Sequence, residues 1–212
     1  MTEALSPPRP WAVYGFVSLA LGVLFVLGLM AGSHWVSPSN LITIFEGNGD
    51  LLTKISVIEL RLPRNLLGLI GGASLGVAGA VMQGVTRNQL ASPGLTGVIA
   101  SAALATVSLR TFGTPSALWL PMAALAGGLF GGALTFAISG RRKLQPERVV
   151  LAGIAVTSMA TALTTAILLM SGSEAAELFY WLAGSLMGRG WQQLQMVLPW
   201  LLIPLAAVLV MH

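Results

Sequence analysis

The chain has 212 residues, of which 55% are hydrophobic and only 8% are charged, and its net charge at pH 7 is +4. A water-soluble domain of this length could not cover its surface with so few charges, and the mean hydropathy of +0.83 agrees. The chain has no cysteine, which excludes disulfides and cysteine metal sites. Because the charge excess is small and the basic residues lie near the ends of apolar windows, we expect no nucleic-acid partner.

Long uncharged windows separate the basic residues, and most are long enough to cross about 30 Å of hydrocarbon as a helix. We therefore expect an all-α fold, a polytopic transmembrane helix bundle. Its six spans are expected near residues 11–31, 65–84, 94–109, 117–138, 149–170 and 194–211. The first window is too long for a signal peptide, so we expect it to be retained. No linker or internal duplication divides the chain, so residues 1–212 are expected to form a single transmembrane domain.

The connection between the first two spans ends in a pair of arginines. Residues 39–52 are expected to form one short helix at the outer interface, and Pro63 is expected to force Leu62 out of helical geometry. Arg61 and Arg64 lie three residues apart and share one face of the start of the second span. Two interpretations stay open: anchors that reach lipid phosphate, or docking cations for an acidic partner.

Small residues recur at helical spacing in two of the expected spans. Gly68, Gly72 and Gly76 follow one another every four residues, and Gly127 and Gly131 repeat the spacing in the fourth span. Such rows let neighbouring helix backbones approach closely inside a membrane. They predict a densely packed bundle.

The loop after the fourth span carries the strongest basic cluster, Arg141, Arg142, Lys143 and Arg148. Short basic loops favour the cytoplasmic side, so we expect a cytoplasmic N-terminus and Arg61 and Arg64 outside. The cluster is either an ordinary inside loop or part of a cytoplasmic gate. Residues 174–188 are too short to span, and form either an aromatic belt at the interface or a half-helix lining a vestibule.

No Asp, Glu, Lys, Arg or His falls in the middle of an expected span, and the sequence contains no catalytic or metal-binding motif. We therefore expect no enzyme activity, no metal and no cofactor. Proton-coupled carriers usually hold an ionisable residue in mid-membrane, so its absence argues against proton coupling. The energy for transport is expected to come from a partner.

Three motifs follow in order: Arg61-Leu62-Pro63-Arg64, a glycine-rich helix ending Gly79-Ala80-Val81-Met82-Gln83-Gly84, and Asn88-Gln89-Leu90-Ala91-Ser92-Pro93-Gly94-Leu95-Thr96-Gly97. Leu151-Ala152-Gly153-Ile154-Ala155 and Tyr180-Trp181-Leu182-Ala183-Gly184-Ser185-Leu186 continue the pattern. Together they resemble the permeases of type II ABC importers (FecCD/BtuC-like), which take up iron–siderophores, haem and vitamin B12. Gln89 departs from the family, where proline is common at that position.

The resemblance implies a bacterial inner-membrane importer. A second permease subunit, identical or different, would complete a central path, and cytoplasmic ATPase subunits would drive it. A periplasmic or lipid-anchored substrate-binding protein would dock through salt bridges to Arg61 and Arg64. The loop 140–148 would lie near the cytoplasmic gate, and residues 149–188 would line the path.

The same family usually has about ten spans per permease, so six spans correspond to its N-terminal part. The contact with the ATPase is expected beyond residue 212, and the chain is interpreted as a fragment, a truncated product or half of a split permease. Family frequency favours an iron–siderophore as cargo. The alternative is a fragment of an ion-gradient-driven secondary carrier.

Overall fold

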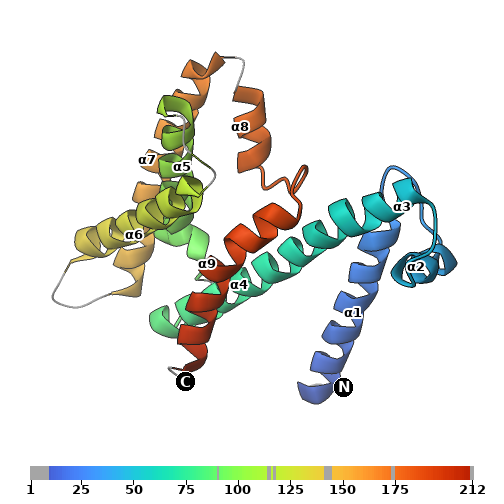
Figure 1. Cartoon of the computed structure of the whole chain (residues 1–212). Helices are drawn as coiled ribbons and strands as arrows, with labels where there is room; N and C mark the ends of the chain where they lie inside the picture. Colours follow the sequence, from blue (N-terminus) through green and yellow to red (C-terminus); the bar gives the residue numbers. More distant parts are fainter. Residues whose placement is uncertain are drawn as a thin grey trace, which may run out of the picture. The chain divides into compact units, whose positions relative to one another are not determined.

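The computed structural model describes residues 10–89, 91–113, 116, 118–140, 145–172 and 175–210 (Figure 1). Its elements are α1 (Pro10–Met30), α2 (Pro38–Phe45), α3 (Leu51–Ile55), the π-helical turn η1 (Ser56–Arg61), α4 (Leu62–Thr86), the 3-10 turn η2 (Pro93–Thr96), α5 (Val98–Phe112), α6 (Trp119–Ser139), α7 (Pro146–Met170), α8 (Ala175–Leu182) and α9 (Trp191–Val210). No strand occurs within these ranges, which confirms the all-α class.

Four helical stretches of the described chain are long and apolar enough to cross a membrane: Trp11–Met30, Leu51–Gly84, Trp119–Ser139 and Pro146–Met170. Val98–Phe112 is apolar but shorter. It begins at 98 rather than at the expected 94, because Gly97 has a left-handed backbone (φ 74°) that separates α5 from η2. The protein is therefore a polytopic helical membrane protein.

The chain divides into two compact units, which are described separately. The first unit runs to Gly68 and also includes Gly188–Leu194. Apolar side chains from the end of α1, from α2 and from η1 form its buried core: Leu29, Met30, Val36, Leu41, Ile44 and Val57. The end of α1 is therefore tied to the chain that leads into α4.

The segment 39–52 contains two short helices instead of the single one expected. Ser37 caps α2, accepting a hydrogen bond from the Asn40 backbone N–H (3.3 Å), and Asp50 caps α3 through the Thr53 N–H (3.2 Å). Between them the chain turns at Gly47 and Gly49, both with positive φ. A second capping residue and two glycines thus interrupt what hydrophobicity alone suggested was continuous.

The expectation that Pro63 breaks the helix at Leu62 is wrong. Leu62 has helical angles (φ −60°, ψ −53°), and α3, η1 and α4 follow one another without a break from Leu51 to Thr86. The wide π-helical turn just before Pro63 absorbs the ring and its missing N–H.

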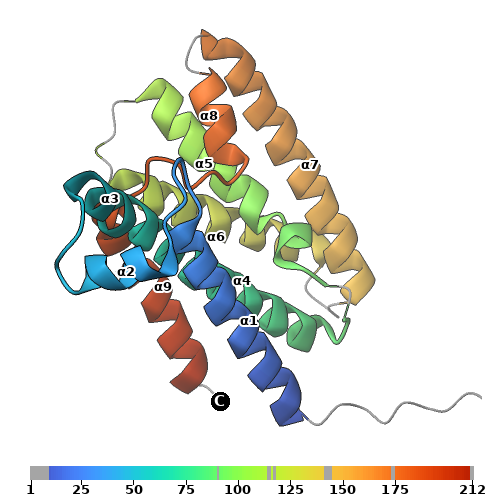
Figure 2. The same cartoon turned by 90° about the vertical axis from the view of Figure 1, so that its right-hand side faces the viewer.

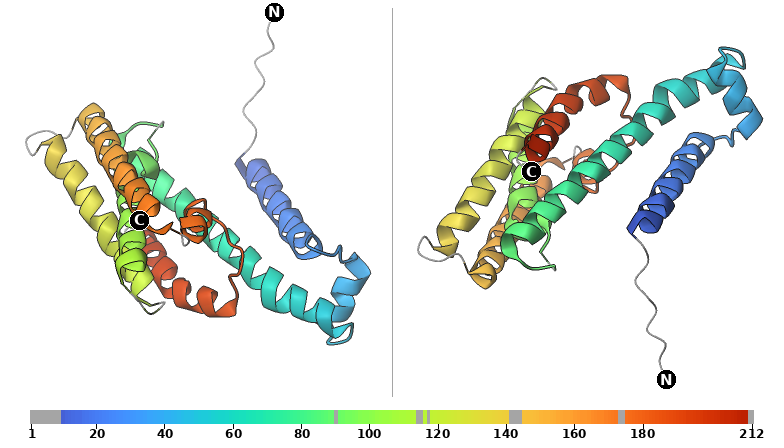
Figure 3. Two further views of the ribbon diagram at one scale, coloured as in Figure 1. Left: turned by 90° about the horizontal axis from the view of Figure 1, so that it is seen from above. Right: turned by 90° about the horizontal axis from the view of Figure 1, so that it is seen from below.

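The second unit comprises Leu69–Met187 with the chain from Gln195 onward, and its centre is a three-helix group. Helices α5, α6 and α7 lie side by side, and α5 contacts both of the others (Figures 2 and 3). Helix α8 turns back along α7 (Figure 1). The turn η2 packs on α7 at one end of this group.

Candidate functional site

Arg61 lies against the C-terminal end of α1. Its side chain is 7% exposed, and its guanidinium donates from Nη1 to the carbonyl oxygens of Leu29 and Met30 (both 2.9 Å) and from Nη2 to that of His34 (2.8 Å). The last carbonyls of a helix have no intrahelical partner and carry a partial negative charge. Arg61 therefore caps α1 from a position 31 residues further along the chain.

Two glycines make room for this contact. A Cβ built on Gly32 would lie 2.5 Å from the guanidinium carbon of Arg61, and one built on Gly28 would lie 2.6 Å from Nδ2 of Asn65. Asn65, four residues after Arg61, donates from Nδ2 to the Phe25 carbonyl (3.2 Å). The sequence analysis missed this paired clasp, although the Gly28–Gly32 spacing of four was its visible signal.

Arg64 occupies a different environment from Arg61. It is only partly buried, and its Nε is shielded from solvent without a hydrogen-bond partner among the described residues. The two Nη atoms likewise have no partner there but are not fully buried. The sequence placed both arginines on one helix face, whereas the structure gives one of them carbonyl partners and leaves the other available.

The π-helical turn η1 leaves one carbonyl for an outside donor. In its wide register the Leu62 N–H reaches the Val57 carbonyl. The equivalent donor for the Ile58 carbonyl would be the nitrogen of Pro63, which carries no hydrogen. The indole Nε1 of Trp191 donates to Ile58 instead (3.0 Å). The segment 188–194 is thereby fastened to the turn that carries Arg61.

In the second unit, the turn η2 is held by its own carbonyls. The Thr157 hydroxyl donates to the Gly94 carbonyl (3.3 Å), and the buried Thr135 hydroxyl donates to that of Thr96 (2.8 Å). Gly153 of α7 lies directly against Leu95, where a Cβ would overlap the backbone carbonyl. Two motifs far apart in the sequence, around Pro93–Gly97 and Leu151–Ala155, therefore form one packed contact.

The two glycine rows have different surroundings. Cβ atoms built on Gly127 and Gly131 would come within 2.5 Å of Ala105 and Ser101 of α5, so α5 and α6 approach closely there. Gly68 is exposed, and no described residue lies within 4 Å of a Cβ built on Gly72 or Gly76. The row in α4 is thus uncovered in the described part of the chain.

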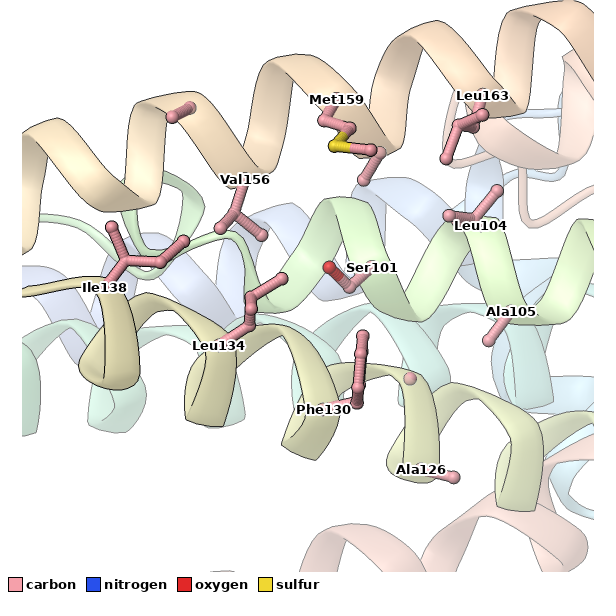
Figure 4. A pocket seen from close by; sticks show the side chains of 13 residues that line it. Ser101, Leu104, Ala105, Ala126, Phe130, Leu134, Ile138, Val156, Met159 and Leu163 are labelled. Carbon is pink, nitrogen blue, oxygen red and sulfur yellow. The ribbon is translucent and has the colours of Figure 1, made fainter.

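An apolar cavity of about 510 Å³ lies between α5, α6 and α7 (Figure 4). Side chains such as Phe130, Leu134, Val156 and Met159 line it, and Ser101 is its one hydroxyl. No ionisable side chain faces it, so it has no means for acid–base or nucleophilic chemistry. Within the described ranges no group of three or more His, Asp or Glu residues could hold a metal.

The predicted cytoplasmic loop is only partly described. Arg141, Arg142 and Lys143 lie outside the described residues. Arg148 is exposed near the start of α7, and its backbone carbonyl accepts a long hydrogen bond from the Ser139 hydroxyl (3.4 Å). The one ion pair in the described part of the chain joins Arg110 to Glu177 (3.9 Å), both largely in solvent.

The family model of the FecCD transport family matches residues 20–212. The iron(3+)-hydroxamate import system permease protein FhuG of Bacillus subtilis (strain 168) is 32% identical over 92% of this chain and 61% of its own length. The ferric enterobactin transport system permease protein FepD of Escherichia coli (strain K12) is 36% identical over 100% and 64%. The vitamin B12 import system permease protein BtuC of Serratia proteamaculans (strain 568) is 36% identical over 91% and 55%.

A solved structure of a metal-chelate type ABC transporter in an inward-facing conformation matches 92% of this chain and 60% of its own, with a TM-score of 0.74 and 26% identity. The chain thus spans about three fifths of the length of these relatives.

Proposed function

The chain belongs to the FecCD transport family, and we propose on that premise that it is the membrane-spanning component of an ATP-driven importer in the bacterial inner membrane. The match over residues 20–212 carries the proposal. The chemistry of the residues supports it, because the apolar cavity offers neither a catalytic group nor a site for a coupling proton. The energy then comes from separate ATPase subunits.

The proposed cargo is an iron–siderophore complex. The relatives include import permeases for iron(3+)-hydroxamate and ferric enterobactin. Delivery requires an outer substrate-binding protein and a second permease subunit that completes the path, with the N-terminus of this chain in the cytoplasm. Arg61 and Arg64 then belong to the outer mouth, and Arg141, Arg142, Lys143 and Arg148 border the cytoplasmic gate.

Uptake of radio-iron by cells that lack other iron-chelate importers tests this function. The complete transporter is expressed with its ATPase and binding protein, and ferric hydroxamate, ferric enterobactin, ferric citrate and labelled cobalamin are supplied in turn. We expect uptake of a ferric siderophore that stops when the Walker-A lysine of the ATPase is replaced and continues when the proton gradient is collapsed. Uptake with the opposite dependence would instead indicate an ion-gradient-driven carrier.

A further inference from the structure

We propose that Arg61 and Arg64 have separate tasks: Arg61 is a positioning residue that fastens the end of α1, and Arg64 alone presents a docking cation to a carboxylate of the binding protein. The proposal rests on the importer function proposed above and refines its outer mouth. Without the structure the two residues look equivalent, because both stand in one short motif.

The hydrogen bonds of Arg61 argue against a docking role. Three of the five guanidinium donors already point to carbonyls of Leu29, Met30 and His34, at 2.8–2.9 Å. The side chain is 7% exposed even with no other protein present. To reach a partner it would have to leave buried carbonyl oxygens without a donor, which is unfavourable.

The surroundings of Arg61 also fit a permanent contact. Gly32 has no Cβ where the guanidinium lies, and Asn65 repeats the arrangement against Gly28 one helical turn away. Two glycines and two polar side chains thus match one another at the same spacing. A side chain that swung out to bind a partner would need neither glycine.

Arg64 has the complementary property. Its Nε is buried without an acceptor among the described residues, while its Nη atoms keep access to solvent. Buried N–H donors rarely stay unpaired in proteins. A carboxylate approaching from outside can accept from Nε and one Nη together, in the bidentate geometry that guanidinium favours. The chemistry that completes Arg64 is therefore an Asp or Glu side chain on the binding protein.

The test compares Arg61→Gln and Arg64→Gln in the complete transporter reconstituted in nanodiscs, with the purified binding protein from the same operon. Two quantities are measured: the dissociation constant over a range of salt concentrations, and the midpoint of thermal unfolding. We expect Arg64→Gln to weaken docking by about tenfold or more and to lower its salt dependence, with an unchanged unfolding midpoint. Arg61→Gln is expected to lower the midpoint and to leave the salt dependence unchanged.

A second pair of variants disturbs the clasp while both arginines remain. Gly32→Ala places a methyl group against the Arg61 guanidinium, and Gly22→Ala is its control, because no described residue lies within 4 Å of a Cβ there. We expect Gly32→Ala to lower the unfolding midpoint as Arg61→Gln does, and Gly22→Ala to have no such effect.

Equal losses of affinity and of salt dependence in Arg61→Gln and Arg64→Gln, without loss of thermal stability, would overturn the division of tasks. So would an Arg64→Gln variant that unfolds earlier but docks normally. If the unaltered transporter does not bind the protein at all, the importer function fails instead. The thermal comparison of Gly32→Ala with Gly22→Ala would still decide the role of Arg61.

Discussion

Replacing Gly153 by alanine tests the contact between α7 and η2. The added Cβ would lie 2.9 Å from both the carbonyl carbon of Leu95 and the Cα of Thr96, where carbon atoms normally stay about 3.5–4.0 Å apart. Backbone atoms cannot rotate away, so the helix and the turn must separate. Overpacking of this kind costs about 1–3 kcal/mol.

The separation also strains the two hydroxyl contacts that hold η2, those of Thr135 (2.8 Å) and Thr157 (3.3 Å), each worth about 1 kcal/mol. Alanine regains about 0.5–1 kcal/mol over glycine inside a helix. The net destabilisation is then about 2–3 kcal/mol. At about 2–4 °C per kcal/mol, the midpoint should fall by about 4–12 °C.

Tryptophan fluorescence during heating of the purified complete permease in detergent measures this shift. Gly22→Ala is the matched control, since it adds the same methyl group to an apolar helix where nothing described lies within 4 Å. A midpoint for Gly153→Ala as high as that of the control would refute the reasoning, because it would mean that α7 does not approach η2 so closely.

Two further substitutions remove single hydrogen bonds. Thr135→Val keeps the shape of the side chain but leaves the Thr96 carbonyl without its hydroxyl donor, and should cost about 1–3 kcal/mol in chemical unfolding; Thr135→Ser, which retains the donor, should lose less. Trp191→Phe removes the indole N–H from the Ile58 carbonyl and should speed amide hydrogen exchange around η1; exchange rates equal to those of the unaltered protein would contradict that bond.

Hydrophobicity along the chain predicted the long helices well, because a charge-free window of about 20 residues has few other folds in a membrane. The windows expected at 11–31 and 117–138 correspond closely to α1 (Pro10–Met30) and α6 (Trp119–Ser139). The start of α4 was predicted less well. Pro63 normally ends a helix, and only the π-helical turn with its distant indole donor keeps this one continuous.

The site was less predictable than the helices because its contacts join distant parts of the chain. The motif around Arg61 and Arg64 is visible in the sequence, but the carbonyls that bind Arg61 belong to the end of a different helix. In the same way Gly153 stands in a recognisable motif, yet only the packed structure shows that Leu95 requires its missing side chain. Spacing identifies such residues, whereas their tasks depend on which backbone they meet.

The indole that completes the π-helical turn has a consequence for biogenesis. Trp191 is made 133 residues after Ile58, which corresponds to roughly 7–27 s at a ribosomal rate of about 5–20 residues per second. Throughout that interval the nascent membrane segment holds a bare carbonyl beside a proline. Insertion of this region into the bilayer therefore cannot be finished in chain order, and its outer end matures only after most of the following helices have been synthesised.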